Sequence, residues 1–163
     1  MIEWSIQEII SLRSLYATNI TDLFFKIVSQ FGDKAILGFT VFFTVHWIGK
    51  TEAFMVMTAF DLSVTALGTL KLYYAEPRPY FLSTDLHPAS CKDLEYGYPS
   101  GHTTITACVY ITLFYCMACL FLFSKKGNFC ESLLTSLFWF IVLCFFLLFI
   151  GFSRLFLGVH SID

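Results

Sequence analysis

The pattern of apolar and polar positions divides the chain into one amphipathic stretch and four long apolar stretches. In residues 1–32, apolar side chains such as Ile9, Ile20 and Phe24 recur at helical spacing between polar ones. This pattern is typical of an amphipathic helix lying in a membrane interface. The apolar stretches lie near residues 33–49, 53–74, 103–124 and 133–152. Since a bilayer core takes about 20 residues of helix to cross, they predict four membrane spans.

The composition supports this division. Hydrophobic residues make up 57% of the chain and charged residues only 13%, whereas about a quarter of the residues of a soluble domain are charged. The net charge of −2 and the lack of a basic run argue against nucleic acid as a partner. We therefore expect a single domain, residues 1–163, that is an all-α, polytopic membrane helical bundle whose partner is the lipid bilayer.

Four spans would sort the polar segments between the two sides of the membrane. Lys50 and the pair Lys125 and Lys126 fall on one side, while the amphipathic stretch, residues 75–102 and the end of the chain fall on the other. Basic residues occur on both sides, so charge alone leaves the orientation open. The arrangement does predict that three polar clusters, distant in sequence, meet on one side.

The first cluster contains Lys71 and Arg78 where the second span ends. Seven residues are almost two helical turns, so these side chains share a face if the helix continues through Pro77. An ammonium group and a guanidinium fork together suit a phosphate. The alternative is a basic pair that extends to the lipid headgroups.

The second cluster, Pro99-Ser100-Gly101-His102, opens the third span. Ser100 is a favourable helix N-cap, and the free N–H groups at a helix start bind anions. Gly101 allows close approach of a ligand, and His102 would lie beside it as a general acid. An ordinary capped helix with an interfacial histidine is the alternative.

The third cluster follows the fourth span and contains Arg154, His160 and Asp163. Asp163 would share a face with His160 if this segment is helical, and a carboxylate there would fix the imidazole tautomer. The other ring nitrogen could then attack phosphorus. A surface histidine and aspartate beside a juxtamembrane arginine are the alternative.

Taken together, the clusters indicate phosphoryl transfer, in which positioning and charge stabilisation dominate. The carboxylates between residues 75 and 102 show no metal-ligand spacing. We therefore expect no metal and no cofactor, and a covalent phosphohistidine route.

The motifs K-x6-R-P, P-S-G-H and S-R-x5-H, in this order, resemble the signatures of the type 2 phosphatidic acid phosphatase/haloperoxidase superfamily. Tyr80 and Phe81 after the first motif, Cys91 in the following loop and the amphipathic start are similar to features of its membrane branch, with glucose-6-phosphatase and the sphingosine-phosphate phosphatases. The resemblance implies a metal-independent helical bundle with a lumenal or extracytoplasmic active site. It implies that His160 is the nucleophile, His102 the acid and Asp163 the orienting residue. The implied phosphate-binding residues are Lys71, Arg78, Ser100, Gly101 and Arg154.

The resemblance also implies a substrate class and a location. We expect a lipid phosphate or diphosphate, with a sugar phosphate as the alternative substrate and an inactive membrane binding or transport protein as the alternative function. The expected location is the endoplasmic reticulum or the plasma membrane. Family members continue into another membrane helix after this point, so we expect a C-terminally incomplete bundle. The alternative is that the stretch around His160 is a loosely held tail.

Overall fold

The computed structural model describes residues 2–82, 96–122 and 129–160. The described residues form helices joined by short connections and contain no strand. The helices are α1 (Ile2–Tyr16), α2 (Asn19–Gln30), α3 (Lys34–Trp47), α4 (Lys50–Tyr74), α5 (Pro79–Leu82), α6 (Gly101–Leu122) and α7 (Phe129–Phe156). The predicted all-α class is confirmed.

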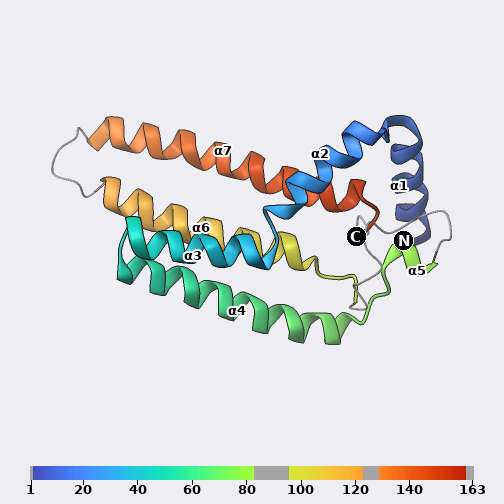
Figure 1. Cartoon of the computed structure of the whole chain (residues 1–163), viewed down its shortest axis with the longest axis horizontal. Coiled ribbons are helices and arrows are strands. Elements are labelled where there is room, and N and C mark those ends of the chain that lie inside the picture. Colours follow the sequence, from blue (N-terminus) through green and yellow to red (C-terminus); the bar gives the residue numbers. More distant parts are fainter. Residues whose placement is uncertain (1, 83–95, 123–128, 161–163) are drawn as a thin grey trace.

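The body of the molecule is a bundle in which α3, α4, α6 and α7 run alongside one another (Figure 1). Helix α4 packs against α3 and α6, and α6 packs against α7. The core between α3, α4 and α6 is a cluster of buried apolar side chains: Leu37, Val56, Leu67, Ile105 and Val109. Leu67 and Ile105 stand at the end of this core where α4 ends and α6 begins, so the core aligns these two helix ends.

Within the described residues, three helices are long and apolar enough to cross a membrane: α4, α6 and α7. Large apolar side chains on their outer faces, such as Leu62, Phe121 and Phe145, are exposed, as is expected where a bilayer replaces water as the solvent. Helix α3 occupies most of the first predicted span, but it has 14 residues and is about 21 Å long at 1.5 Å per residue. It is therefore shorter than the bilayer core that a span has to cross.

The N-terminal stretch is two helices and not the single interfacial helix expected over residues 1–32. The break comes at Thr18, whose Oγ1 accepts from the N–H of Thr21, while the side chain of Thr21 accepts from the N–H of Thr18. This capping box begins a new helix. Helix α1 crosses the end of the bundle, and α2 runs diagonally back toward α3 (Figure 1).

Aromatic contacts hold α2 against α7. The ring of Phe25 lies 4.3 Å from that of Phe156, measured between centroids, and also contacts Phe149 and Phe152. Helix α1 is tied to the same place, since Arg13 Nη1 donates to the carbonyl oxygen of Phe156 at 2.8 Å. The end of α7 is therefore enclosed by the two N-terminal helices.

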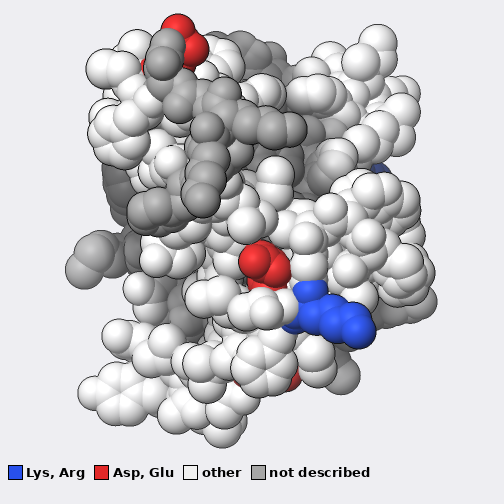
Figure 2. Space-filling model, turned by 90° about the vertical axis from the view of Figure 1, so that its left-hand side faces the viewer, with Lys and Arg blue, Asp and Glu red and all other residues white. Residues whose placement is uncertain are grey.

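The two ends of the bundle differ in what they carry. The end of α4, the start of α6 and the end of α7 lie together beside α1 (Figure 1). The opposite end, seen in Figure 2, shows a basic and an acidic side chain next to each other near the middle of the face, and further acidic atoms at its upper edge. The turn between α3 and α4, with Lys50 and Glu52, belongs to that end. The described parts of the three predicted clusters thus lie at one end of the bundle.

Candidate active site

A polar cavity of about 290 Å³ lies at the end of the bundle beside α1. It brings together side chains from the three motifs and from the connection between α2 and α3. Its lining residues are Gly32, Asp33, Lys34, Leu67, Lys71, Arg78, Gly101, His102, Ile105, Arg154 and His160. Six of the predicted site residues therefore meet in one cavity, although they are distributed over 90 residues of sequence.

Lys71 and Arg78 reach the cavity by a route that the sequence analysis did not predict. Helix α4 ends at Tyr74, before the prolines, so the condition for a shared helical face, a helix that continues through Pro77, is not met. Ala75 adopts a left-handed conformation (φ 47°, ψ 33°), and its N–H donates to the carbonyl of Lys71 at 2.9 Å. This turn redirects the chain so that Arg78, only 3% exposed, returns to the cavity that Lys71 lines.

The chain that leads into α6 packs directly on Arg78. The N–H of Gly97 donates to the carbonyl of Glu76 at 2.8 Å. A Cβ atom at position 97 would lie 3.3 Å from the carbonyl oxygen of Pro77 and 3.4 Å from Cα of Arg78. The lack of a side chain at Gly97 therefore lets two loops meet closely beside the cavity.

Ser100 and Gly101 form the start of α6. The carbonyl of Ser100 accepts from the N–H of Thr104 at 3.0 Å, which places Ser100 at the N-cap position. Its Oγ accepts from the hydroxyl of Thr103 at 3.1 Å and does not line the cavity. A Cβ atom at position 101 would lie 3.2 Å from Leu67 Cδ2 and 4.0 Å from Lys71 Nζ. Gly101 thus lets the helix start lie close to Leu67 and to the Lys71 ammonium, at a place where an anion is favoured.

The end of α7 supplies the third wall. Arg154 is 8% exposed, and its Nη1 donates to Ser29 Oγ on α2 at 2.9 Å. After α7 ends at Phe156, Gly158 adopts a left-handed conformation (φ 67°) that turns the chain back toward the cavity. The N–H of Val159 then donates to the carbonyl of Arg154 at 3.2 Å. His160 is 6% exposed, so the segment leading to it is packed into the protein and is not a loosely held tail.

The surroundings of His160 favour its neutral form. Burial is the main cause that lowers its pKa to about 3, and the charges of Arg154, Arg78 and Lys71 lower it further. A hydrogen bond to the backbone of Gly97 partly opposes them. A neutral imidazole keeps a lone pair on one ring nitrogen. His160 therefore has the protonation state that a nucleophile needs at physiological pH.

Asp163 lies outside the described residues, so its predicted contact with His160 stays a prediction. His160 itself follows a turn and does not continue α7. The cavity wall formed by Gly32, Asp33 and Lys34, and the bond from Ser29 to Arg154 behind it, were not predicted from the sequence. The available signal was the polar run Gly32-Asp33-Lys34 at the beginning of an apolar stretch, which was assigned simply to the start of a span.

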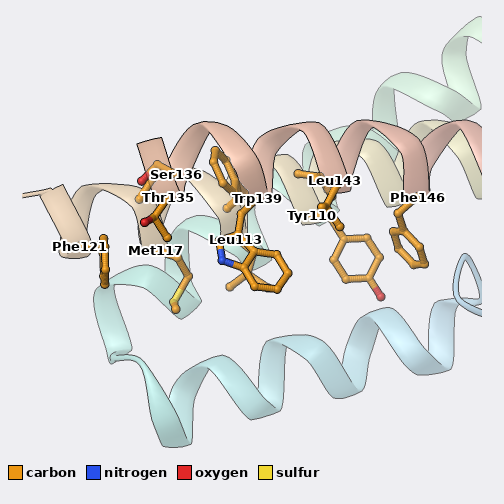
Figure 3. Close-up of a pocket in the computed structure, with 12 residues that line it drawn as sticks. Tyr110, Leu113, Met117, Phe121, Thr135, Ser136, Trp139, Leu143 and Phe146 are labelled. Atoms are coloured by element: carbon orange, nitrogen blue, oxygen red, sulfur yellow. The ribbon is translucent and has the colours of Figure 1, made fainter. Parts of the chain in front are cut away.

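A second and larger cavity of about 530 Å³ has a different character. It is a groove between α6 and α7, and Figure 3 shows Tyr110, Trp139 and Phe146 among the side chains that line it. Its lining residues carry no charged group. The smaller, polar cavity is therefore the candidate active site.

Comparison with protein families matches residues 49–163, well over half of the chain, to the PAP2 superfamily. The chain belongs to the PAP2 superfamily. This confirms the resemblance noted in the sequence at the level of the superfamily, and with it a membrane helical bundle of this type. Membership of the PAP2 superfamily indicates phosphatase activity on a phosphate ester. No curated protein and no solved structure matches the chain significantly.

The PAP2 match begins just before α4 and therefore includes Lys71, Arg78, His102, Arg154 and His160. Helices α1, α2 and α3 precede it. The cavity wall at residues 32–34, and Ser29, which accepts a hydrogen bond from Arg154, therefore belong to a part of the chain outside the match.

Proposed function

We propose that this chain is an integral membrane phosphatase that hydrolyses a lipid phosphate or diphosphate through a phosphohistidine at His160. The observation that carries the proposal is the cavity itself. It combines a buried, neutral imidazole with the cationic side chains of Lys71, Arg78 and Arg154 and with a second histidine, His102. Such a combination suits a trigonal transferring phosphoryl group, whose charge is spread over three oxygens.

The first step is attack of a ring nitrogen of His160 on phosphorus. The N–P bond forms as the bond from phosphorus to the ester oxygen breaks, and His102 donates a proton to the departing oxygen. Lys71, Arg78 and Arg154, with the free N–H groups at the start of α6, stabilise the charge on the other phosphate oxygens. Ser100 and Gly101 contribute through their backbone, and Ser100 also caps the helix.

The second step reverses these roles. His102, now neutral, accepts a proton from a water molecule that attacks phosphorus, and the N–P bond breaks. Inorganic phosphate leaves, and His160 returns to its neutral form. We assign to Asp163 the orientation of the His160 ring. The scheme uses only side chains and backbone groups of this chain, so we expect hydrolysis to continue in the presence of EDTA.

A lipid is the preferred substrate class because the polar cavity lies at one end of a bundle with an apolar exterior. A phosphate at the membrane surface would reach this end while its hydrocarbon part stayed in the bilayer. We further propose that this end is lumenal or extracytoplasmic, in the endoplasmic reticulum or the plasma membrane. Labelling of a cysteine introduced at exposed Tyr73 in sealed vesicles would report its side.

The test is phosphate release by the purified protein in detergent from a panel of lipid phosphates, lipid diphosphates and glucose 6-phosphate. We expect EDTA-resistant release from the lipids, inhibition by vanadate, and loss of release in His160→Ala. Unchanged release in that variant would contradict the assigned mechanism. Preference for the sugar phosphate would change the substrate class, and binding of substrate without release by the folded wild type would favour an inactive binding protein.

A further inference from the structure

The connection between α2 and α3 forms a wall of the active site although it precedes the residues that match the family. Two contacts link it to the motifs. Ser29 bonds to Arg154 of the third motif, and Gly32 lies against His102 of the second. Ser29 and Arg154 are 125 residues apart in sequence, so only the tertiary structure brings them together.

The position of Ser29 is set by the aromatic contacts between α2 and α7. Phe25 precedes Ser29 by four residues and therefore shares its helix face. The Phe25 ring lies 4.3 Å from that of Phe156, two residues after Arg154. The same packing that attaches α2 to α7 thus brings the Ser29 hydroxyl to the guanidinium group. Both side chains are buried, with 5% and 8% exposure.

The chemistry of a serine suits this place. A hydrogen bond to a charged group is shorter and stronger than a neutral one, so Ser29 Oγ fixes the orientation of the Arg154 fork. A carboxylate in the same place would bind the Arg154 guanidinium more strongly, but its negative charge would cancel the positive charge of the guanidinium. The neutral hydroxyl adds no negative charge beside the guanidinium of Arg154, which lines the cavity.

We infer that Ser29 is a positioning residue that holds the guanidinium of Arg154 for the transferring phosphoryl group, so that α2 is a functional part of the active site. The inference rests on the phosphatase function proposed above. It assigns a role in the reaction to a helix that precedes the matched residues. It also explains why the residue at this position is a small, buried, polar one.

The test compares Ser29→Ala with a matched control, Ser63→Ala. Ser63 is also buried, at 6% exposure, and its hydroxyl donates to the carbonyl of Phe60 within its own helix. Because hydrogen bonds to charged groups are the stronger ones, we expect Ser29→Ala to lower kcat/KM about 10- to 100-fold and to weaken vanadate inhibition by a similar factor. The control is expected to keep both values within about twofold.

A double-mutant cycle distinguishes positioning from a purely structural role. The readout is the vanadate dissociation constant, obtained from the rise of the melting temperature with vanadate concentration. If Ser29 acts through Arg154, the Ser29→Ala substitution weakens vanadate binding when Arg154 is present. In a protein that already carries Arg154→Ala, it causes no further loss of vanadate affinity. Equal losses in both backgrounds, or an unchanged constant in Ser29→Ala, would overturn the inference.

These outcomes are separate from the test of the proposed function. A wild type that releases phosphate, with a Ser29→Ala variant of equal kcat/KM and equal vanadate affinity, would refute the positioning role alone. A folded wild type that binds vanadate but releases no phosphate from any substrate would refute the proposed function. The vanadate cycle would then still show whether Ser29 orients Arg154 toward an oxyanion.

Discussion

Gly32 and His102 touch across the active site. A Cβ atom at position 32, just after α2, would lie 3.0 Å from Cβ of His102 on α6 and 3.2 Å from its Cδ2. The same atom would lie 3.0 Å from the hydroxyl oxygen of Thr106, one turn further along α6. The missing side chain at Gly32 therefore allows the N-terminal segment to fit against the proposed acid.

Gly32→Ala is expected to displace His102 and to reduce turnover. The added methyl group meets a backbone-anchored Cβ atom, which cannot move without α6, and overpacking of this kind costs typically about 1–3 kcal/mol. The measurement is kcat together with the melting temperature in detergent. Gly38→Ala is the control, because a Cβ atom at position 38 on α3 meets nothing within 4 Å. Equal kcat in wild type and Gly32→Ala would show that the contact does not constrain His102.

The role of His102 as an acid predicts a dependence on the leaving group. His102→Ala should lose about 10²- to 10⁴-fold in kcat with an alkyl phosphate, since this is the usual contribution of general acid–base catalysis. The loss should be much smaller with an aryl phosphate whose phenol leaves without a proton. His160→Ala should be inactive toward both. An equal loss in His102→Ala with the two esters would indicate that His102 only binds phosphate.

The lowered pKa of His160 predicts how the stability of the folded protein changes with pH. Its pKa is lowered to about 3 in the folded protein, against about 6.5 in an unfolded chain. Between these two pH values the unfolded state binds a proton that the folded state does not. The contribution of neutral His160 to the free energy of unfolding is therefore fully present above about pH 6.5 and falls as the pH drops toward 3. The fall attributable to this one group is at most about 1.4 kcal/mol per pH unit.

The measurement is the melting temperature of wild type and His160→Asn in detergent between pH 7 and pH 5. We expect acidification to lower the melting temperature of the wild type more than that of the variant, which lacks the imidazole. Parallel curves for the two proteins would mean that His160 is not held in its neutral form. Bound vanadate should reduce the wild-type loss, because an oxyanion offsets the positive charges that disfavour a protonated His160.

The left-handed backbone of Ala75 predicts that a glycine at this position would stabilise the protein. Its left-handed conformation (φ 47°) ends α4, and this region costs a residue with a Cβ atom roughly 1–2 kcal/mol. Ala75→Gly is expected to raise the melting temperature by a few degrees and to retain activity, because the turn that returns Arg78 to the cavity is kept. Ala66→Gly, within the helical part of α4, is the control and should destabilise by about 0.8–1.0 kcal/mol. A lower melting temperature in Ala75→Gly would contradict the expected relief of strain.

The sequence by itself determined the class of the protein and predicted most residues of its candidate site. The long apolar stretches predicted the helices α4, α6 and α7, because a helix that faces lipid is apolar over its whole length. The motifs predicted Lys71, Arg78, His102, Arg154 and His160 as site residues, because these residue types suit a phosphate and the predicted spans placed the three clusters on one side. All five line the cavity.

Only the tertiary structure decided how these residues are held. The left-handed turn at Ala75, and not a continuous helix, returns Arg78 to the cavity that Lys71 lines. The capping box at Thr18 divides the expected N-terminal helix in two and directs α2 onto α7. The contacts of Ser29 with Arg154 and of Gly32 with His102 leave no signal in local periodicity, because they join residues far apart in sequence. Periodicity reports which face of a helix is apolar, whereas the partner that a polar or small residue meets is fixed by packing.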